Sequence, residues 1–241
     1  MRHLIELKRV HPVEREPAPA SAADMRLVIF DFDGVVVDSE AIACRVLATA
    51  LSRHGFPADV SLVVDRYLGR AFSVVRDDYA AALGRPIPDD FSSDYGRELE
   101  AAFRADLRPM AGVAAALDHL AARGLPFAIA SSSSQGRIAQ ALSVTALAGH
   151  FGDRIFDAAM VERGKPAPDL FLYVARQMGA APAQSLVIED SPAGVRAGKA
   201  AGMTVWGFTG GAHHASFDGD AALQAAGADR LITSMADLLV L

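Results

Sequence analysis

The chain has 241 residues, and its 23 basic and 29 acidic side chains give a net charge of −6 at pH 7. This length allows one or two domains of roughly 150 residues each. Its three lysines, Lys8, Lys165 and Lys199, cannot form a basic stripe along a phosphate backbone, so we expect no nucleic-acid partner. A binding site for a small anion would have to be local.

A single cysteine, Cys44, excludes an internal disulfide and a cysteine-based zinc cluster. One cysteine is typical of a reducing compartment, and we expect a cytoplasmic protein. The longest uncharged stretch, residues 200–217, contains several glycines and two histidines, so we expect no membrane helix. Residues 1–24 carry scattered charges and three prolines, which indicates a loosely ordered leader and not a secretory signal.

After Met25, short apolar runs alternate with segments of helical length. The run LVIFD, which begins at Leu27, is typical of a strand buried on both faces of a parallel sheet. Further strands are predicted at 126–130, 185–188, 204–206 and 230–233, and helices at 113–123, 137–142, 169–178, 193–201 and 221–226. The alternation predicts an α/β fold with a Rossmann-like parallel sheet flanked by helices.

Residues 39–108 interrupt this alternation. They contain helical patterns at 42–54, 73–83 and 94–107 and no convincing strand pattern, and Pro109 follows where the alternation resumes. We therefore predict an inserted α-helical domain at 39–108 and an α/β core formed by 25–38 and 109–241.

Polar side chains follow several predicted strands, at the sheet edge where ligands bind in open α/β folds. Asp31, Asp33 and Gly34 follow the first strand, a serine run at 131–134 follows the second, and Glu189 and Asp190 follow the strand at 185–188. Lys165 lies in the loop GKPAPD. These groups are expected to meet at one edge of the sheet.

Together these side chains favour phosphoryl transfer. Asp31 and Asp190 would offer the oxygen ligands that Mg²⁺ prefers, and the cation would let a carboxylate approach a phosphate ester. Asp31 would then be the nucleophile, and Asp33 the general acid and base. Gly34 would permit a tight turn.

Phosphate binding is expected from Ser131, Ser132, Lys165 and free amides at the start of the helix after the serine run. Each group also has a structural interpretation: the acids as turn or capping residues, the serines as a linker, and the lysine as a surface residue. Their combination at neighbouring strand ends favours a functional site.

The sequence resembles the haloacid dehalogenase (HAD) superfamily, subclass I, over residues 25–241. FDFDGVVVDSE is similar to its first motif, IASSSS to its second, RGKPAPDLF to its third and VIEDSPAGVRAGKAAGM to its fourth. The resemblance implies that Asp31 is the nucleophile and Asp33 the acid/base. It also implies that Ser131 and Lys165 contact phosphate and that Mg²⁺ is held by Asp31, Asp190 and the Asp33 backbone carbonyl. Glu189 is a nearby acid with no assigned role.

The resemblance further implies that residues 39–108 are a cap that closes over the site, with hinge crossings at 37–40 and 107–110. Arg70 in this cap is either a contact to a distal anionic group of the substrate or a surface arginine. His213 and His214, in a glycine-rich loop, are expected to be solvated and not to bind metal, and Cys44 is expected to pack inside the first cap helix.

Within the family, Asp33 disfavours dehalogenases, which lack an aspartate there, and a cap without lysine disfavours phosphonate hydrolases. Mutases of the β-phosphoglucomutase-like branch carry a histidine at the position of Ala43 and a cap lysine, and both are missing here. We therefore predict a Mg²⁺-dependent phosphatase, monomeric or weakly dimeric, for a small phosphorylated metabolite such as a sugar or sugar-acid phosphate.

The stretch VWGFTGGAHH resembles 6-phosphogluconate phosphatase-type sugar phosphatases. A mutase of the β-phosphoglucomutase-like branch is the alternative, and a non-catalytic phosphate-binding protein is a further one.

Overall fold

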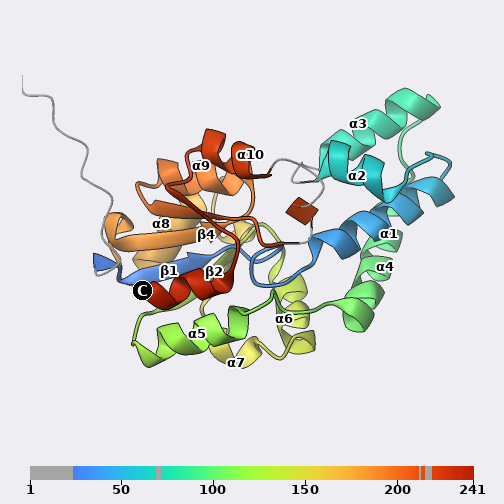
Figure 1. The fold of residues 1–241 in the computed structure, drawn as a ribbon. Coiled ribbons are helices and arrows are strands. Elements are labelled where there is room, and N and C mark those ends of the chain that lie inside the picture. Colours follow the sequence, from blue (N-terminus) through green and yellow to red (C-terminus); the bar gives the residue numbers. More distant parts are fainter. Residues whose placement is uncertain (1–23, 69–71, 212, 215–218) are drawn as a thin grey trace, which may run out of the picture.

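The computed structural model describes residues 24–68, 72–211, 213–214 and 219–241 (Figure 1). Almost all of the predicted leader, and Arg70 in the predicted cap, lie outside the described residues. The predictions made for them therefore stay predictions.

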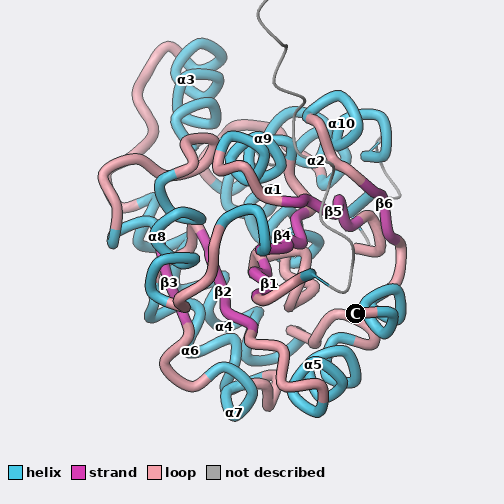
Figure 2. Tube along the Cα trace, turned by 90° about the vertical axis from the view of Figure 1, so that its left-hand side faces the viewer, coloured by secondary structure: helices cyan, strands magenta, loops and turns pink. Residues whose placement is uncertain are grey.

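Six parallel strands form a sheet in the order β3-β2-β1-β4-β5-β6, which can be followed from left to right in Figure 2. The strands are β1 (Leu27–Phe30), β2 (Phe127–Ser131), β3 (Ile155–Asp157), β4 (Ser185–Glu189), β5 (Thr204–Phe208) and β6 (Arg230–Ile232). In the register of the sheet, Phe30 of β1 lies between Ile129 of β2 and Ile188 of β4. The carboxyl ends of these three central strands therefore lie side by side.

Two layers of helices cover the sheet. Alternate residues of β1 point to opposite faces, so that Val28 and Phe30 pack on one side and Leu27 and Ile29 on the other. The first side is covered by α5 (Val113–Ala122), α6 (Gln135–Val144), α7 (Ala148–Phe151) and the 3₁₀ helix η5 (Met235–Val240). The second side is covered by α8 (Asp169–Gln177), α9 (Pro192–Ala200) and α10 (Gly219–Ala226). Two short 3₁₀ helices complete this part of the chain, η2 (Ala158–Met160) and η3 (Pro182–Gln184).

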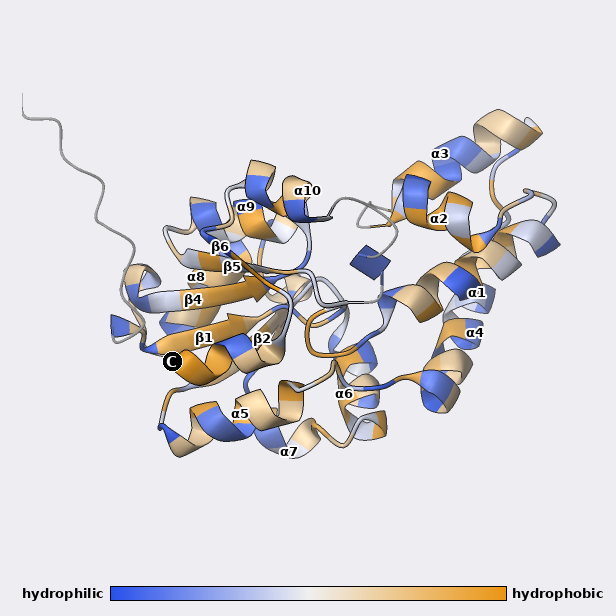
Figure 3. Ribbon diagram, viewed as in Figure 1, coloured by the Kyte–Doolittle hydropathy of each residue, from blue (hydrophilic) through white to orange (hydrophobic). Residues whose placement is uncertain are grey.

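The predicted α/β fold with a Rossmann-like parallel sheet is thereby confirmed. Apolar residues concentrate on the strands and on the helix faces turned toward them (Figure 3), as expected of strands buried on both sides. Among the described residues, no helix combines the length and the apolar character needed to cross a membrane.

Between β1 and α5 the described residues form four helices: α1 (Glu40–Arg53), α2 (Val60–Tyr67), α3 (Phe72–Leu83) and α4 (Phe91–Asp106). This helical segment (α1–α4) stands beyond the carboxyl ends of the strands in Figure 1. Its outer part has an apolar cluster of its own, in which Tyr79 is fully buried and donates a hydrogen bond to the His54 carbonyl (2.8 Å). Its inner part, including Phe103 of α4, packs into the same cluster as β1.

The chain passes between the sheet and the helical segment at two points that lie next to each other. The Asp38 amide donates to the Arg108 carbonyl (3.1 Å), and the Met110 amide donates to the Val36 carbonyl (2.9 Å). These crossings lie in the segments 37–40 and 107–110, which were predicted to be hinges, and the hinge role stays a prediction. The division into a core and a cap domain itself stays a proposal.

Besides the 3₁₀ helices, one strand and two α-helices of the described residues were not predicted: β3, α2 and α7. β3 has three residues and pairs only with β2 among the described strands. α2 has eight residues, and its first turn is capped by Asp59, whose carboxylate accepts a hydrogen bond from the Leu62 amide (2.8 Å).

Cys44 packs in the apolar cluster of the helical segment, as predicted, with 3% of its surface exposed. Burial, with a smaller contribution from the charge of Glu40, raises the pKa of its thiol to about 12. At pH 8 the thiolate fraction is then about 10⁻⁴, against about one quarter for an ordinary cysteine.

We expect the native protein to react with Ellman's reagent far more slowly than the protein in guanidinium chloride. Rapid stoichiometric labelling of the native chain would contradict this packing.

Candidate active site

Lys165 joins the ends of three neighbouring strands. Its ammonium group donates hydrogen bonds to Asp31 Oδ1 (2.5 Å), to Glu189 Oε1 (2.7 Å) and to the Ala130 carbonyl (2.9 Å). Asp31 directly follows β1, Ala130 belongs to β2, and Glu189 ends β4. The Lys165 side chain is 5% exposed, so this positive charge is buried among the strand ends.

Burial and the neighbouring charges shift the pKa values of this cluster. Burial alone lowers the pKa of Lys165, but the carboxylates of Asp31 and Glu189 raise it, and the net pKa lies above the ordinary range, which keeps the lysine charged. Burial raises the pKa of Asp31, although the charge of Lys165 acts in the opposite direction. Burial also raises the pKa of Asp190, and the charge of Glu189 raises it further. The cluster therefore holds more carboxylates than its one lysine neutralises.

The carboxylates of Asp31, Glu189 and Asp190 each offer an oxygen within 4.8 Å of the others. Glu189 is already engaged, because its Oε2 accepts hydrogen bonds from the Ser191 amide and hydroxyl, both at 2.9 Å, while its Oε1 accepts from Lys165. Asp31 and Asp190 remain as ligands, and hard oxygen donors with unbalanced negative charge are what Mg²⁺ prefers. The donor set therefore fits Mg²⁺.

Asp33 is held by three donors from different parts of the chain. Its Oδ1 accepts from the Ser39 hydroxyl (2.7 Å) and from the Arg137 guanidinium (2.9 Å), and its Oδ2 accepts from the Ser133 hydroxyl (2.6 Å). Arg137 also lies over the ring of Phe103 in α4, with 5.1 Å between the guanidinium carbon and the ring centroid. The Asp33 carboxylate is thus connected to the sheet edge, to α6 and to the helical segment.

Gly34 brings the first loop against Asp190. Its backbone has φ +78°, a conformation that suits glycine, and a Cβ at this position would overlap the Asp190 carboxylate. Any larger residue would push the first loop away from the acid.

Some backbone amides of the serine run and of the first turn of α6 donate to side chains. The Ser133 amide donates to Ser131 Oγ (3.0 Å), the Gln135 amide donates to Asp157 Oδ2 (3.0 Å), and the Arg137 amide donates to Ser134 Oγ (3.5 Å). Side chains therefore satisfy these three amides, and the prediction that free amides at the start of this helix bind phosphoryl oxygens stays a prediction.

One cavity of about 560 Å³ collects most of the site residues that the sequence singles out: Asp31, Asp33, Ser131, Ser132, Lys165, Glu189 and Asp190. Its lining also includes Glu40, Ser133 and Arg137, which were not predicted as site residues. Ser133 belongs to the serine run, and Arg137 is a charged residue in the first turn after that run. Both positions could therefore have been proposed as site residues from the sequence. Glu40 and Arg137 also line an adjoining cavity of about 310 Å³ within the helical segment.

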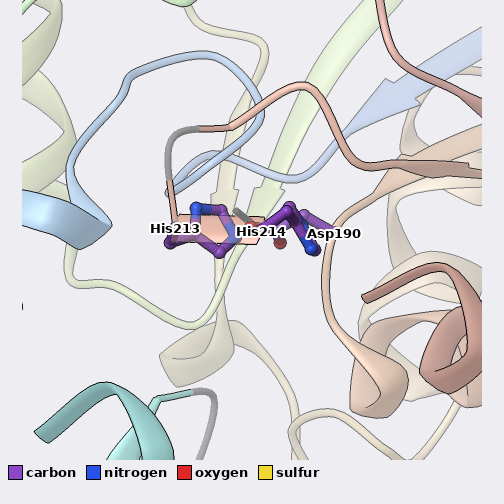
Figure 4. Close-up of side chains that lie close together, drawn as sticks. All are labelled: Asp190, His213 and His214. Atoms are coloured by element: carbon purple, nitrogen blue, oxygen red, sulfur yellow. Dashed lines mark ion pairs between the residues drawn. The ribbon is translucent and has the colours of Figure 1, made fainter. Parts of the chain in front are cut away.

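The expectation that His213 and His214 are solvated is wrong. They are 4% and 8% exposed, their ring centroids lie 4.1 Å apart, and His213 Nε2 lies 3.1 Å from Asp190 Oδ2 (Figure 4). Burial lowers the pKa of both rings, that of His214 to about 4. The glycine-rich loop therefore brings two buried imidazoles to the edge of the acidic cluster.

A parallel α/β sheet with acids, a buried lysine and a cavity at its carboxyl edge is the architecture of an α/β enzyme whose site handles anionic groups. The family model of haloacid dehalogenase-like hydrolases matches residues 25–202. The chain belongs to this family of hydrolases, and the predicted family is confirmed.

Among curated proteins, hexitol phosphatase A of Escherichia coli is 34% identical over 187 residues, which cover 73% of this chain and 80% of the relative. The 6-phosphogluconate phosphatase of the same organism is 26% identical over 191 residues, which cover 78% of this chain and 84% of the relative. The chain spans about half (47%) of the length of the bifunctional riboflavin kinase/FMN phosphatase of Arabidopsis thaliana, at 32% identity over 74% of this chain.

Among solved structures, a HAD family hydrolase from Deinococcus radiodurans with bound phosphate and sodium superimposes with a TM-score of 0.76 and 38% sequence identity. The match covers 90% of this chain and 94% of that structure. The resemblance therefore extends over the sheet and the helical segment.

The buried lysine provides a test of the site's energetics. Removing one partner of a buried ion pair typically costs about 3–5 kcal/mol, because the other charge is left uncompensated. We expect Lys165→Met to lower the free energy of unfolding at pH 7 by this amount, as measured by urea denaturation. The same substitution at Lys199, whose side chain is 36% exposed and pairs with Asp229, is the matched control and should cost about 1 kcal/mol or less. Equal effects of the two substitutions would contradict the buried role of Lys165.

Proposed function

We propose that this protein is a Mg²⁺-dependent phosphatase that hydrolyses a small phosphorylated metabolite through an aspartyl-phosphate on Asp31. The observation that carries the proposal is the common cavity in which Asp31, Asp33, Lys165 and Asp190 meet. It combines a nucleophile, a second acid and a buried cation, which are the groups that phosphoryl transfer needs.

Mg²⁺ would be held by Asp31, Asp190 and the backbone carbonyl of Asp33. When bound, it would neutralise charge on the phosphoryl group and so allow the anionic Asp31 to approach. Lys165 and the Ser131 and Ser132 hydroxyls would hold the phosphoryl oxygens from the other side of the cavity.

In the first step an Asp31 oxygen attacks phosphorus, the bond between phosphorus and the ester oxygen breaks, and Asp33 gives its proton to the leaving oxygen. In the second step Asp33 takes a proton from water, which attacks the phosphorus of the aspartyl-phosphate and releases inorganic phosphate. The hydrogen bonds from Ser39, Ser133 and Arg137 orient the Asp33 carboxylate for both transfers.

We propose a sugar or sugar-acid phosphate as the substrate. The adjoining cavity of about 310 Å³ is of a size for a small metabolite, and it opens beside the reacting groups because Glu40 and Arg137 line both spaces. The names of the two Escherichia coli relatives support this substrate class.

In this proposal the helical segment is the cap, and it would close over the substrate by bending at the paired crossings near Val37 and Pro109.

The nucleophile is tested by Asp31→Asn. Because the amide cannot form the acyl phosphate, we expect Mg²⁺-dependent release of phosphate from p-nitrophenyl phosphate to fall by at least about a thousandfold. The exposed Asp153 allows the same chemical change away from the site, and Asp153→Asn should keep full activity. Full activity of a folded Asp31→Asn protein would overturn the assignment.

Hydrolysis and isomerisation are distinguished by their products. We expect a panel of hexose, hexitol and sugar-acid phosphates to give free inorganic phosphate without any added sugar bisphosphate, because the helical segment offers no histidine at Ala43 and no lysine at positions 39–108. Phosphate release and sugar phosphates can be followed together by phosphorus NMR. An isomerised sugar phosphate as the main product would favour the mutase.

A further inference from the structure

We propose that Asp190, His213 and His214 form a second metal site, which binds a transition-metal dication such as Zn²⁺. The three side chains each offer a ligand atom within 4.8 Å of the others. Figure 4 shows the two imidazoles and the carboxylate close together.

The distances suit a shared ion. His213 Nε2 and Asp190 Oδ2 are 3.1 Å apart, close to the separation of two ligands that each lie about 2.1 Å from one zinc ion. The three residues are 8%, 4% and 8% exposed in chain order, so the donors sit in a buried position and not on a loop surface.

Three glycines leave room for the imidazoles. A Cβ at Gly34 would come within 3.0 Å of the His213 ring as well as overlapping Asp190, and a Cβ at Gly211 would come within 2.6 Å of the same ring. A Cβ at Gly219 would overlap the ring of His214. The backbone therefore packs closely against both imidazole rings, and a side chain at any of these three positions would displace a ring.

The donor set selects a different metal from that of the carboxylate cluster. Imidazole nitrogens suit zinc and related ions, whereas Mg²⁺ prefers oxygen ligands throughout. With two histidines and one aspartate the site would have three protein ligands, which is the number in many zinc sites that keep one position for water. The site proposed here is therefore distinct in chemistry from the Mg²⁺ site, although the two share Asp190.

The shared residue has a consequence for catalysis that rests on the proposed function. An ion held by the histidines would draw the Asp190 carboxylate toward them and away from Asp31. Zn²⁺ would then inhibit the Mg²⁺-dependent reaction, and a high Mg²⁺ concentration would weaken the inhibition.

The binding is tested on the full chain after removal of metals, by competition between the protein and a chromophoric zinc chelator. We expect one Zn²⁺ per chain, and at least about tenfold weaker binding in His213→Gln and in His214→Gln, since even loss of an outer partner of a ligand costs this much. His150 also faces a carboxylate, that of Asp118 at 3.1 Å, so His150→Gln is the matched control and should bind as the unmodified protein does.

A second variant leaves all three ligands in place. Gly219→Ala lies at the first residue of α10, where alanine is a good helix former, and its methyl group would displace the His214 ring. We expect it to weaken Zn²⁺ binding as well, with an unchanged circular dichroism spectrum. Co²⁺ added to the unmodified protein should give visible absorption bands that the His213 and His214 variants lose.

The proposal fails if the unmodified protein binds no stoichiometric Zn²⁺, or if both folded histidine variants bind it as tightly. Neither result bears on the phosphatase proposal, because the chelator assay requires no turnover. Conversely, loss of phosphatase activity in Asp31→Asn leaves the zinc measurement intact.

Discussion

The buried contact between Lys165 and the strand ends is the interaction on which the site depends. Parallel strands bring their carboxyl ends to one edge, and there β1 and β4 deliver carboxylates that would repel one another if left alone. Lys165 bonds to Asp31, to Glu189 and to the β2 carbonyl at once. Glu189 in turn accepts two hydrogen bonds from Ser191, which caps α9 by accepting from the Gly194 amide. One cation thus aligns three strands and the helix that follows them.

Asp190 lies at the boundary between two kinds of chemistry. On one side it faces Asp31 and Glu189, a cluster of oxygen donors, and on the other it faces the imidazole of His213. Its place depends on Gly34, since a side chain there would collide with the carboxylate. The relative affinity of the two sides for different cations would then decide how this aspartate is used.

Asp33 links the reacting groups to the helical segment. Ser39, which precedes α1, donates to its carboxylate, and Arg137 bonds to it while lying over Phe103 of α4. A movement of α1 or α4 would therefore change the surroundings of the Asp33 carboxylate directly. If the helical segment is a cap that closes over a substrate, as proposed, this connection would adjust Asp33 when the substrate is enclosed.

The order of apolar runs was enough to predict five of the strands, their parallel arrangement and the helical insert, because burial on both faces leaves a continuous apolar signal. The edge strand β3 and the helix α2 were not predicted, although β6 and α10 have the same lengths and were. The acids and Lys165 could be named from their places after strands, since strand ends converge in any parallel sheet. Contacts between distant segments could not be predicted in this way. Arg137 contacts Asp33 although the two residues are 104 positions apart in the chain. His213 and His214 are buried, whereas their place in a glycine-rich loop had suggested exposure to solvent. Such burial depends on the space that neighbouring segments leave in the folded protein, and the local sequence pattern does not determine that space.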